Sequence, residues 1–297
     1  RRRGGRRGGR LCQAPRVVDD RAPRYVLVSL HAHPDDEALL TGGTLARAAA
    51  EGHRTVLVVA TDGAAGLADG APGAALAQRR ARELAASAAA LGVARVVRLG
   101  HRDSGYLVPA GAGAGPSGPV FSALPVDGLA AEVAAVLREE RADVLTTYDA
   151  HGGYGHPDHV HVHRIGVAAA ALAGTPVVLE ATVDRTWVRR ALRLAARVPG
   201  LVGDVTADRV ADGFTARADL THRVDVRAHA AAKRASLAAH ASQSETGGRR
   251  GIRGIGALLL LPRPVFRRAL GREWFTERGR APGGVLLDDV FASLRRG

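Results

Sequence analysis

Short apolar segments alternate with longer helical segments along much of the chain, and this alternation constrains the fold more than any other feature. Strands that alternate with helices are typical of a mostly parallel sheet, whose strands are buried on both faces. We therefore expect an α/β fold with a Rossmann-like, mostly parallel sheet flanked by helices. The predicted strands are 25–30, 55–60, 95–99, 144–148 and 176–179, and the predicted helices are 37–50, 75–91, 127–140 and 226–241.

The two ends of the chain differ from this pattern. Six of the first ten residues are arginines, interspersed with glycines, a composition that cannot form a hydrophobic core. We expect residues 1–22 to be a disordered basic tail and residues 23–297 to form a single domain, with irregular cover of the sheet from about residue 180. Two glycine-rich segments, 104–125 and 242–253, are predicted loops.

The expected location follows from what the sequence lacks. A single cysteine, Cys12, excludes an internal disulfide. No apolar core of a signal peptide follows the arginine-rich start, and the leucine-rich run 257–261 is far too short to span a bilayer. We therefore expect a cytoplasmic protein without a membrane span. No methionine occurs, even at position 1, so a preceding segment stays open.

A first polar cluster, residues 31–37, holds two histidines and three acids directly after the first predicted strand. Ligands of open α/β sheets bind at the carboxyl ends of the strands. If Asp36 begins a helix, His33 and Asp36 are three residues apart and converge on one point, whereas Asp35 is rotated away. We therefore expect His33 and Asp36 to hold a metal ion and Asp35 to stay free to accept a proton from water.

A second polar cluster, residues 151–163, contains five of the twelve histidines and follows another predicted strand. His156 and His159 repeat the three-residue spacing of the first cluster, again with proline after the first histidine. Two neighbouring strands would bring His159 to the ion that the first cluster holds. Three protein ligands and an open position for water are typical of catalytic zinc. Nitrogen and oxygen donors suit Zn²⁺, with Fe²⁺ or Co²⁺ as alternatives.

The remaining polar side chains of the clusters have less defined roles. His161 and His163 alternate with valine, and we expect them to orient a ligand or to lie at the surface. His31 is expected to pack or to support a ligand. Glu37 either ligates the ion or, because it follows Asp36 by one residue, makes hydrogen bonds that hold the loop.

Five short motifs occur between about residues 23 and 245: HPDDE at 33–37, RAREL at 80–84, RDSG at 102–105, GHPDH at 155–159 and HASQ at 240–243. Their order and spacing resemble those of the zinc-dependent de-N-acetylases, known as the PIG-L or LmbE-like family. The family includes the N-acetylglucosaminyl-phosphatidylinositol deacetylases and the bacterial deacetylase of mycothiol biosynthesis. The resemblance implies hydrolysis of the N-acetyl or N-acyl group of a small amino-sugar substrate by metal-activated water.

The resemblance also implies a role for each residue of the two clusters. It makes His33, Asp36 and His159 the metal ligands, in agreement with the spacing argument. Asp35 would be the general base. His156 would stabilise the tetrahedral intermediate or protonate the leaving amine, with Asp158 orienting it and Tyr154 contributing from the same loop.

Three further side chains suit a polyhydroxylated or phosphorylated substrate. Arginine forks match neighbouring acceptors and a carboxylate accepts two hydroxyl protons, so Arg80, Arg102 and Asp103 are candidate substrate contacts. Surface ion pairing would explain Arg80 nearly as well. Residues 38–41, Ala-Leu-Leu-Thr, replace the polar residues that the family's mycothiol enzymes usually have there, which argues against the mycothiol precursor as substrate.

Two alternatives to amino-sugar deacetylation stay open. One is amidase action on a thiol conjugate or a secondary-metabolite amide. The other is polyanion binding by the basic tail with a structural metal, favoured by the formal net charge of +13. No interleaved aromatic platform for bases is visible in the sequence, so we do not expect a nucleic-acid partner.

Overall fold

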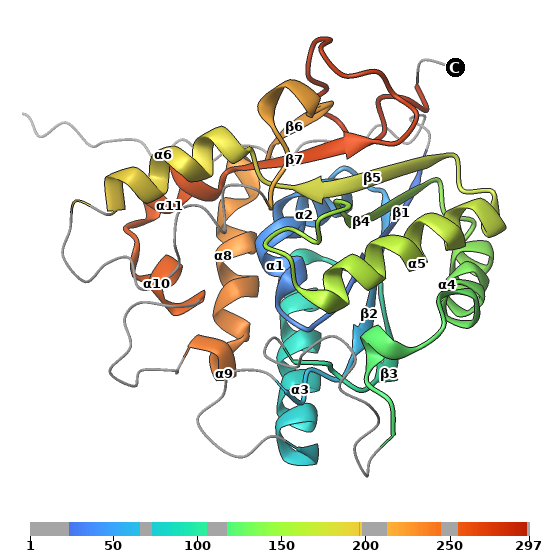
Figure 1. Ribbon diagram of the computed structural model, residues 1–297. Helices are drawn as coiled ribbons and strands as arrows, with labels where there is room; N and C mark the ends of the chain where they lie inside the picture. Colours follow the sequence, from blue (N-terminus) through green and yellow to red (C-terminus); the bar gives the residue numbers. More distant parts are fainter. Residues whose placement is uncertain are drawn as a thin grey trace, which may run out of the picture.

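The computed structural model describes residues 24–65, 73–105, 118–195, 197, 213–244 and 255–295 (Figure 1). The predicted basic tail 1–22 lies outside the described residues, as do most of the two predicted glycine-rich loops. No helix in the described ranges is long and apolar enough to cross a membrane.

The centre of the fold is a seven-stranded sheet with the order β3-β2-β1-β4-β5-β7-β6. The first five strands in this order are parallel, and β7 and β6 are antiparallel to their neighbours. The predicted mostly parallel α/β sheet is therefore confirmed. The strands are β1 Val26–His31, β2 Arg54–Thr61, β3 Arg95–His101, β4 Val144–Tyr148, β5 Val177–Thr182, β6 His222–Asp225 and β7 Arg272–Glu277.

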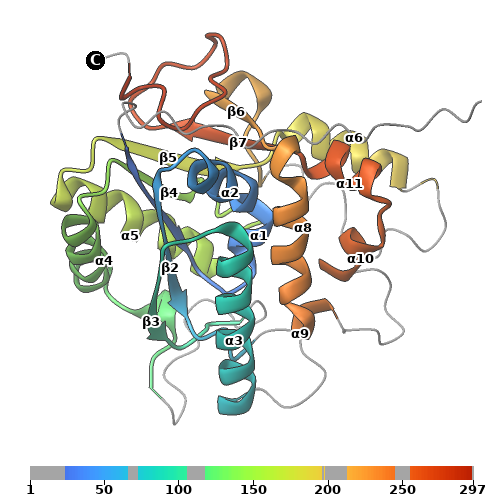
Figure 2. The same cartoon turned by 180° about the vertical axis from the view of Figure 1, so that it is seen from behind.

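Helices cover both faces of the sheet, with α4 and α5 on one face and α2, α3 and α8 on the other (Figures 1 and 2). Alternate residues of β1 belong to different cores: Val28 packs with α4 and α5, whereas Leu27 packs with α2. The helices are α1 Asp36–Leu40, α2 Gly42–Ala50, α3 Ala74–Leu91, α4 Val126–Glu140, α5 Pro157–Ala173, α6 Arg185–Ala195, α8 Ala230–Ala239, α9 Ala241–Ser244, α10 Ile255–Leu260 and α11 Arg263–Leu270. Short 3₁₀ turns lie at Phe121–Ala123, Arg217–Asp219 and Arg227–His229.

The predicted helix 37–50 is two helices that meet at Thr41. The Thr41 side chain lies 2.9 Å from Nε2 of His31 and 3.1 Å from Oγ of Ser29, which draws this residue toward β1. Helix α2 then starts at a glycine pair. A Cβ atom on Gly43 would lie 2.4 Å from Cγ2 of Val226, so only glycine permits this close approach of α2 to the C-terminal part of the chain.

The C-terminal part adds two strands that the sequence pattern does not predict. β7 pairs with β5 and β6 pairs with β7, extending the sheet beyond its parallel strands. The predicted helix 226–241 begins as a 3₁₀ turn and continues as α8. Glu273 of β7 accepts hydrogen bonds from the backbone N–H groups of Gly43 and Thr44, at the start of α2. The C-terminal strands are thereby attached to the helices that follow the first polar cluster.

Candidate active site

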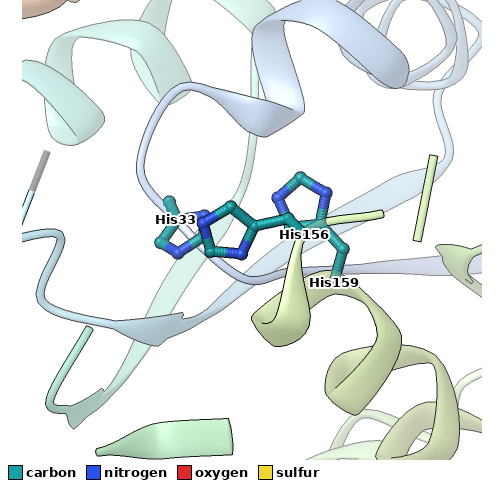
Figure 3. A group of neighbouring side chains, drawn as sticks. All are labelled: His33, His156 and His159. Carbon is teal, nitrogen blue, oxygen red and sulfur yellow. The ribbon is translucent and has the colours of Figure 1, made fainter. Parts of the chain in front are cut away.

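The parallel pairing of β1 with β4 brings the two polar clusters to the same edge of the sheet. The register places Ser29 beside Thr146, so both strands end on the same side. The first cluster follows β1, and His156 caps the N-terminus of α5 after β4. Figure 3 shows the rings of His33, His156 and His159 gathered between these segments. Their ring centroids are 4.6 to 5.4 Å apart.

Asp36 lies between the two histidines that were predicted to share a metal with it. Its Oδ2 atom is 3.2 Å from Nδ1 of His33 and 3.3 Å from Nε2 of His159. Burial alone would raise the pKa of Asp36, but the His159 and His33 rings hold it well below its ordinary value. The Tyr148 hydroxyl donates to the same oxygen at 2.6 Å. Asp36 is therefore held as a carboxylate that faces both rings.

The donor atoms of this cluster fit a metal ion. Nε2 of His159 is buried and, apart from its 3.3 Å ion-pair contact with Asp36, has no hydrogen-bond partner among the described residues, which suits a nitrogen that binds a cation. The donors are imidazole nitrogens and carboxylate oxygens, as zinc and related ions prefer. Two groups of three possible ligand atoms lie within 4.8 Å of one another: His33, His156 and His159, and His33, Asp103 and Asp158. Neither group is the predicted ligand set, because neither includes Asp36, although both include His33 and one includes His159.

The other side of the His33 ring is surrounded by acids. Its Nε2 atom is 3.1 Å from Oδ2 of Asp158 and 3.4 Å from Oδ1 of Asp103. Burial would lower the pKa of His33, yet hydrogen bonds to Asp103, Asp158 and Asp36 raise it well above its ordinary value. Because the carboxylates of Asp36, Asp103 and Asp158 surround the His33 ring, this buried site favours a positive charge.

Asp35 is turned away from Asp36, as the spacing predicts. Its carboxylate is 3.2 Å from Nη2 of Arg80, and its backbone N–H donates to Oε2 of Glu37 at 2.9 Å. Its φ of 113° lies in the left-handed region that favours glycine. Burial raises the pKa of its carboxyl to about 6, although Arg80 opposes the shift.

His156 is oriented by the backbone of the helix that it caps. Its Nδ1 atom accepts the backbone N–H of Asp158 at 3.1 Å, so the proton of the neutral ring is on Nε2. Burial, with His33 and His159 nearby, lowers the pKa of His156 to about 4. The ring is therefore neutral near pH 7 and can donate a hydrogen bond.

Asp158 and Tyr154 lie in the site in ways that the sequence does not specify. The resemblance implies that the carboxylate of Asp158 orients His156, but in the structure this carboxylate contacts His33 and the backbone N–H of Ser104. Tyr154 is 46% exposed, and its ring packs edge-on against His159 with centroids 5.2 Å apart. Tyr154 thus lies at the solvent side of the cluster.

The three candidate substrate contacts differ in their surroundings. Arg80 is buried, and it donates to the carbonyl oxygens of Gly63, at 2.8 Å, and Pro34 as well as pairing with Asp35. Asp103 is buried against His33. Arg102 is exposed and donates to the Gly118 carbonyl oxygen at 3.0 Å. The structure therefore places Arg80 and Asp103 within the site and Arg102 on a loop at its edge.

Three other histidines of the clusters, His31, His161 and His163, make contacts within the fold. His31, which was expected to pack or to support a ligand, bonds to Ser29 and Thr41. His161 packs edge-on against Phe121 with centroids 5.1 Å apart, and Nδ1 of His163 lies 2.9 Å from the Tyr148 carbonyl oxygen.

Sequence reasoning assigned no role to Tyr148 or His240, both of which contribute to the site. Tyr148 bonds Asp36, and Nε2 of His240 lies 2.6 Å from Oε1 of Glu37. A tyrosine at the carboxyl end of a buried strand was the available signal for the first. For His240 the only signal was its motif, because the contact joins residues 203 positions apart.

These features define an α/β protein with a buried cluster of residues able to bind a metal ion at the carboxyl edge of its sheet. Residues 28–170 match the family model described as PIG-L, GlcNAc-PI de-N-acetylase. The chain belongs to this family, as its motifs indicate, because relatives with more than 30% identity match most of its length.

Two such relatives are named 1D-myo-inositol 2-acetamido-2-deoxy-alpha-D-glucopyranoside deacetylase. The Streptomyces griseus protein is 38% identical over 247 residues, covering 74% of this chain and 75% of its own. A Nocardioides protein is 36% identical over 306 residues, covering 90% of this chain and 98% of its own. Among solved structures, the N,N'-diacetylchitobiose deacetylase of Pyrococcus horikoshii has the same fold, with a TM-score of 0.55, 17% identity and coverage of 91% and 88% of the two chains.

Proposed function

We propose that the protein, a hydrolase of the deacetylase family, removes the acetyl group from 1D-myo-inositol 2-acetamido-2-deoxy-α-D-glucopyranoside or a closely similar N-acetylglucosaminide, with Zn²⁺ as its metal. The substrate is the one in the names of the relatives that match most of the chain. One observation carries the chemistry: Asp36 lies between His33 and His159, while the neighbouring carboxylate, Asp35, is held outside this group by Arg80.

Each residue of the site has a task that its contacts support. His33, Asp36 and His159 would hold the zinc, which when bound polarises the amide carbonyl and lowers the pKa of a water molecule toward about 7. Asp35 takes the proton of the attacking water. His156 stabilises the negative oxygen of the tetrahedral intermediate through its Nε2–H, since its Nδ1 accepts from the backbone. The leaving amine then takes up a proton, which Asp35 can return.

The four residues after the first signature do not argue against this substrate. Ala38 is buried in a core with Leu237 and Phe266, and Leu39 packs against the same core. Thr41 bonds to His31. Leu40 packs against the two main cores, so the apolar character of residues 38–40 follows from packing and gives no information about the substrate.

The function is tested with zinc-loaded protein and a panel of amides. We expect acetate release from the GlcNAc-inositol compound with kcat/KM at least tenfold above that for free N-acetylglucosamine, N,N'-diacetylchitobiose, longer N-acyl analogues and a thiol-conjugate amide. A preference for the longer acyl groups or the thiol conjugate would establish the amidase alternative instead. No hydrolysis of any member would refute the proposal.

Removal of the metal is a separate prediction. Dialysis against a chelator is expected to abolish acetate release, and one equivalent of Zn²⁺ to restore it, because the three donors hold a single ion. The His159→Ala variant is expected to retain less than a tenth of the zinc measured by elemental analysis after dialysis. His53→Ala is the control, because its ring accepts the backbone N–H of Tyr25, just before the start of β1 and away from the ligands, and it should retain zinc like the parent. Full zinc retention by His159→Ala would exclude His159 as a ligand.

A further inference from the structure

Glu37 is a fully buried carboxylate whose oxygens are both engaged. Oε1 accepts from the Ser87 hydroxyl of α3 at 2.5 Å and lies 2.6 Å from Nε2 of His240, directly after α8. Oε2 accepts the backbone N–H of Asp35 at 2.9 Å. Ser87 in turn bonds Ser236 of α8 at 2.7 Å. Glu37 thus connects the backbone of Asp35 to two helices that are distant in the sequence.

The Asp35 backbone needs such support. A φ of 113° is costly for a residue with a Cβ atom, and no side chain at the start of α1 caps the helix. The surrounding structure must therefore impose this conformation. Glu37 holds the amide of Asp35, while Arg80 holds its carboxylate and the carbonyl oxygen of Pro34.

His240 determines how Glu37 is held. Its ring is fully buried, and Nε2 donates to the oxygen of Glu37 opposite the one that binds Asp35. This contact fixes the rotation of the carboxylate, so the other oxygen stays aimed at the Asp35 amide. Without the histidine, Ser87 would remain as a donor to Oε1. The buried carboxylate of Glu37 would nevertheless lose one of its donors, and it could then rotate toward other donors and away from the Asp35 amide.

We propose that the His240–Glu37 pair positions Asp35 for catalysis. The pair holds the left-handed backbone of Asp35, so that the Asp35 carboxylate points away from the metal ligands and toward the place of the attacking water. This inference rests on the proposed function, in which Asp35 is the base. It assigns a part of the active site to the end of α8, more than 200 residues from the first cluster. His240 acts through Glu37 and is a positioning residue.

The test compares His240→Ala and His240→Gln with the zinc-loaded parent on the amide that the parent hydrolyses best. We expect His240→Ala to lose on the order of 100-fold in kcat, the usual effect of misplacing a reacting group by about 1 Å, with KM and zinc content changed less than twofold. His240→Gln should recover at least a tenth of the parent kcat, because its amide nitrogen can replace Nε2 as the donor. His222→Gln is the control, since His222 is equally buried but lies on β6. It should keep the parent kcat.

A crystal structure of His240→Ala gives a readout that does not depend on the substrate. We expect the φ of Asp35 to leave the positive region or its carboxylate to move away from Arg80. A variant with the parent kcat and an unchanged Asp35 would overturn the proposal, as would a loss confined to zinc content or KM. If the parent hydrolyses no amide of the panel, the proposed function fails, and the position of Asp35 in this crystal structure still decides the inference.

Discussion

The Asp35→Asn variant is expected to lose roughly 10²- to 10⁴-fold in kcat, the usual contribution of a general base. Asparagine has nearly the same shape, and its amide oxygen can still accept from Arg80, which lies 3.2 Å from the carboxylate. It cannot take a proton from water. The loss should therefore appear in kcat, while KM and zinc content remain close to those of the parent.

Steady-state kinetics on the GlcNAc-inositol compound and elemental analysis of zinc check this prediction. Asp127→Asn is the matched control, because Asp127 is an exposed acid in the first turn of α4, where it contacts none of the residues of the site. It should behave like the parent. If Asp35→Asn keeps the parent kcat, Asp35 is not the base.

Lys233→Met is expected to lower the free energy of unfolding by about 3–5 kcal/mol, the usual cost of removing one partner of a buried ion pair. Lys233 is 1% exposed and Glu273 is 2% exposed, with Nζ of the lysine 2.5 Å from Oε1 of the glutamate. The lysine also donates to the Leu39 carbonyl oxygen at 2.8 Å. Methionine fills the space of the side chain but leaves the carboxylate without its counter-charge.

Urea unfolding followed by circular dichroism measures this loss. The double variant Lys233→Met/Glu273→Gln should recover part of it, because the neutral amide needs no counter-charge and its oxygen can still accept from the start of α2. Arg278→Met removes an exposed pair with Glu180 of similar length, 2.8 Å, and should cost less than about 1 kcal/mol. If Lys233→Met lowers the free energy of unfolding no more than Arg278→Met does, the buried pair contributes little to stability.

The fold and the predicted metal ligands could be inferred from local patterns. Buried parallel strands appear in the sequence as continuous apolar runs, which is why β4 was predicted at its observed bounds. His33 and Asp36 are three residues apart on one turn of chain, and their contact at 3.2 Å follows from that spacing. The strands β6 and β7 were missed because most of their residues are polar or charged, so neither shows a continuous apolar run: only Val224 is apolar in β6, and only Trp274 and Phe275 in β7.

The sequence by itself determined the class of fold, the family and the residues able to bind a metal, because each depends on residue type and short-range spacing. Only the tertiary structure decided how those residues are held. The carboxylate of Asp158 contacts the ring of His33 instead of that of His156, Arg80 holds Asp35, and His240 holds Glu37. These contacts join segments between about 45 and 200 residues apart. Which polar groups meet at such distances depends on the packing of α3, α5 and α8 against the sheet, and no local pattern encodes it.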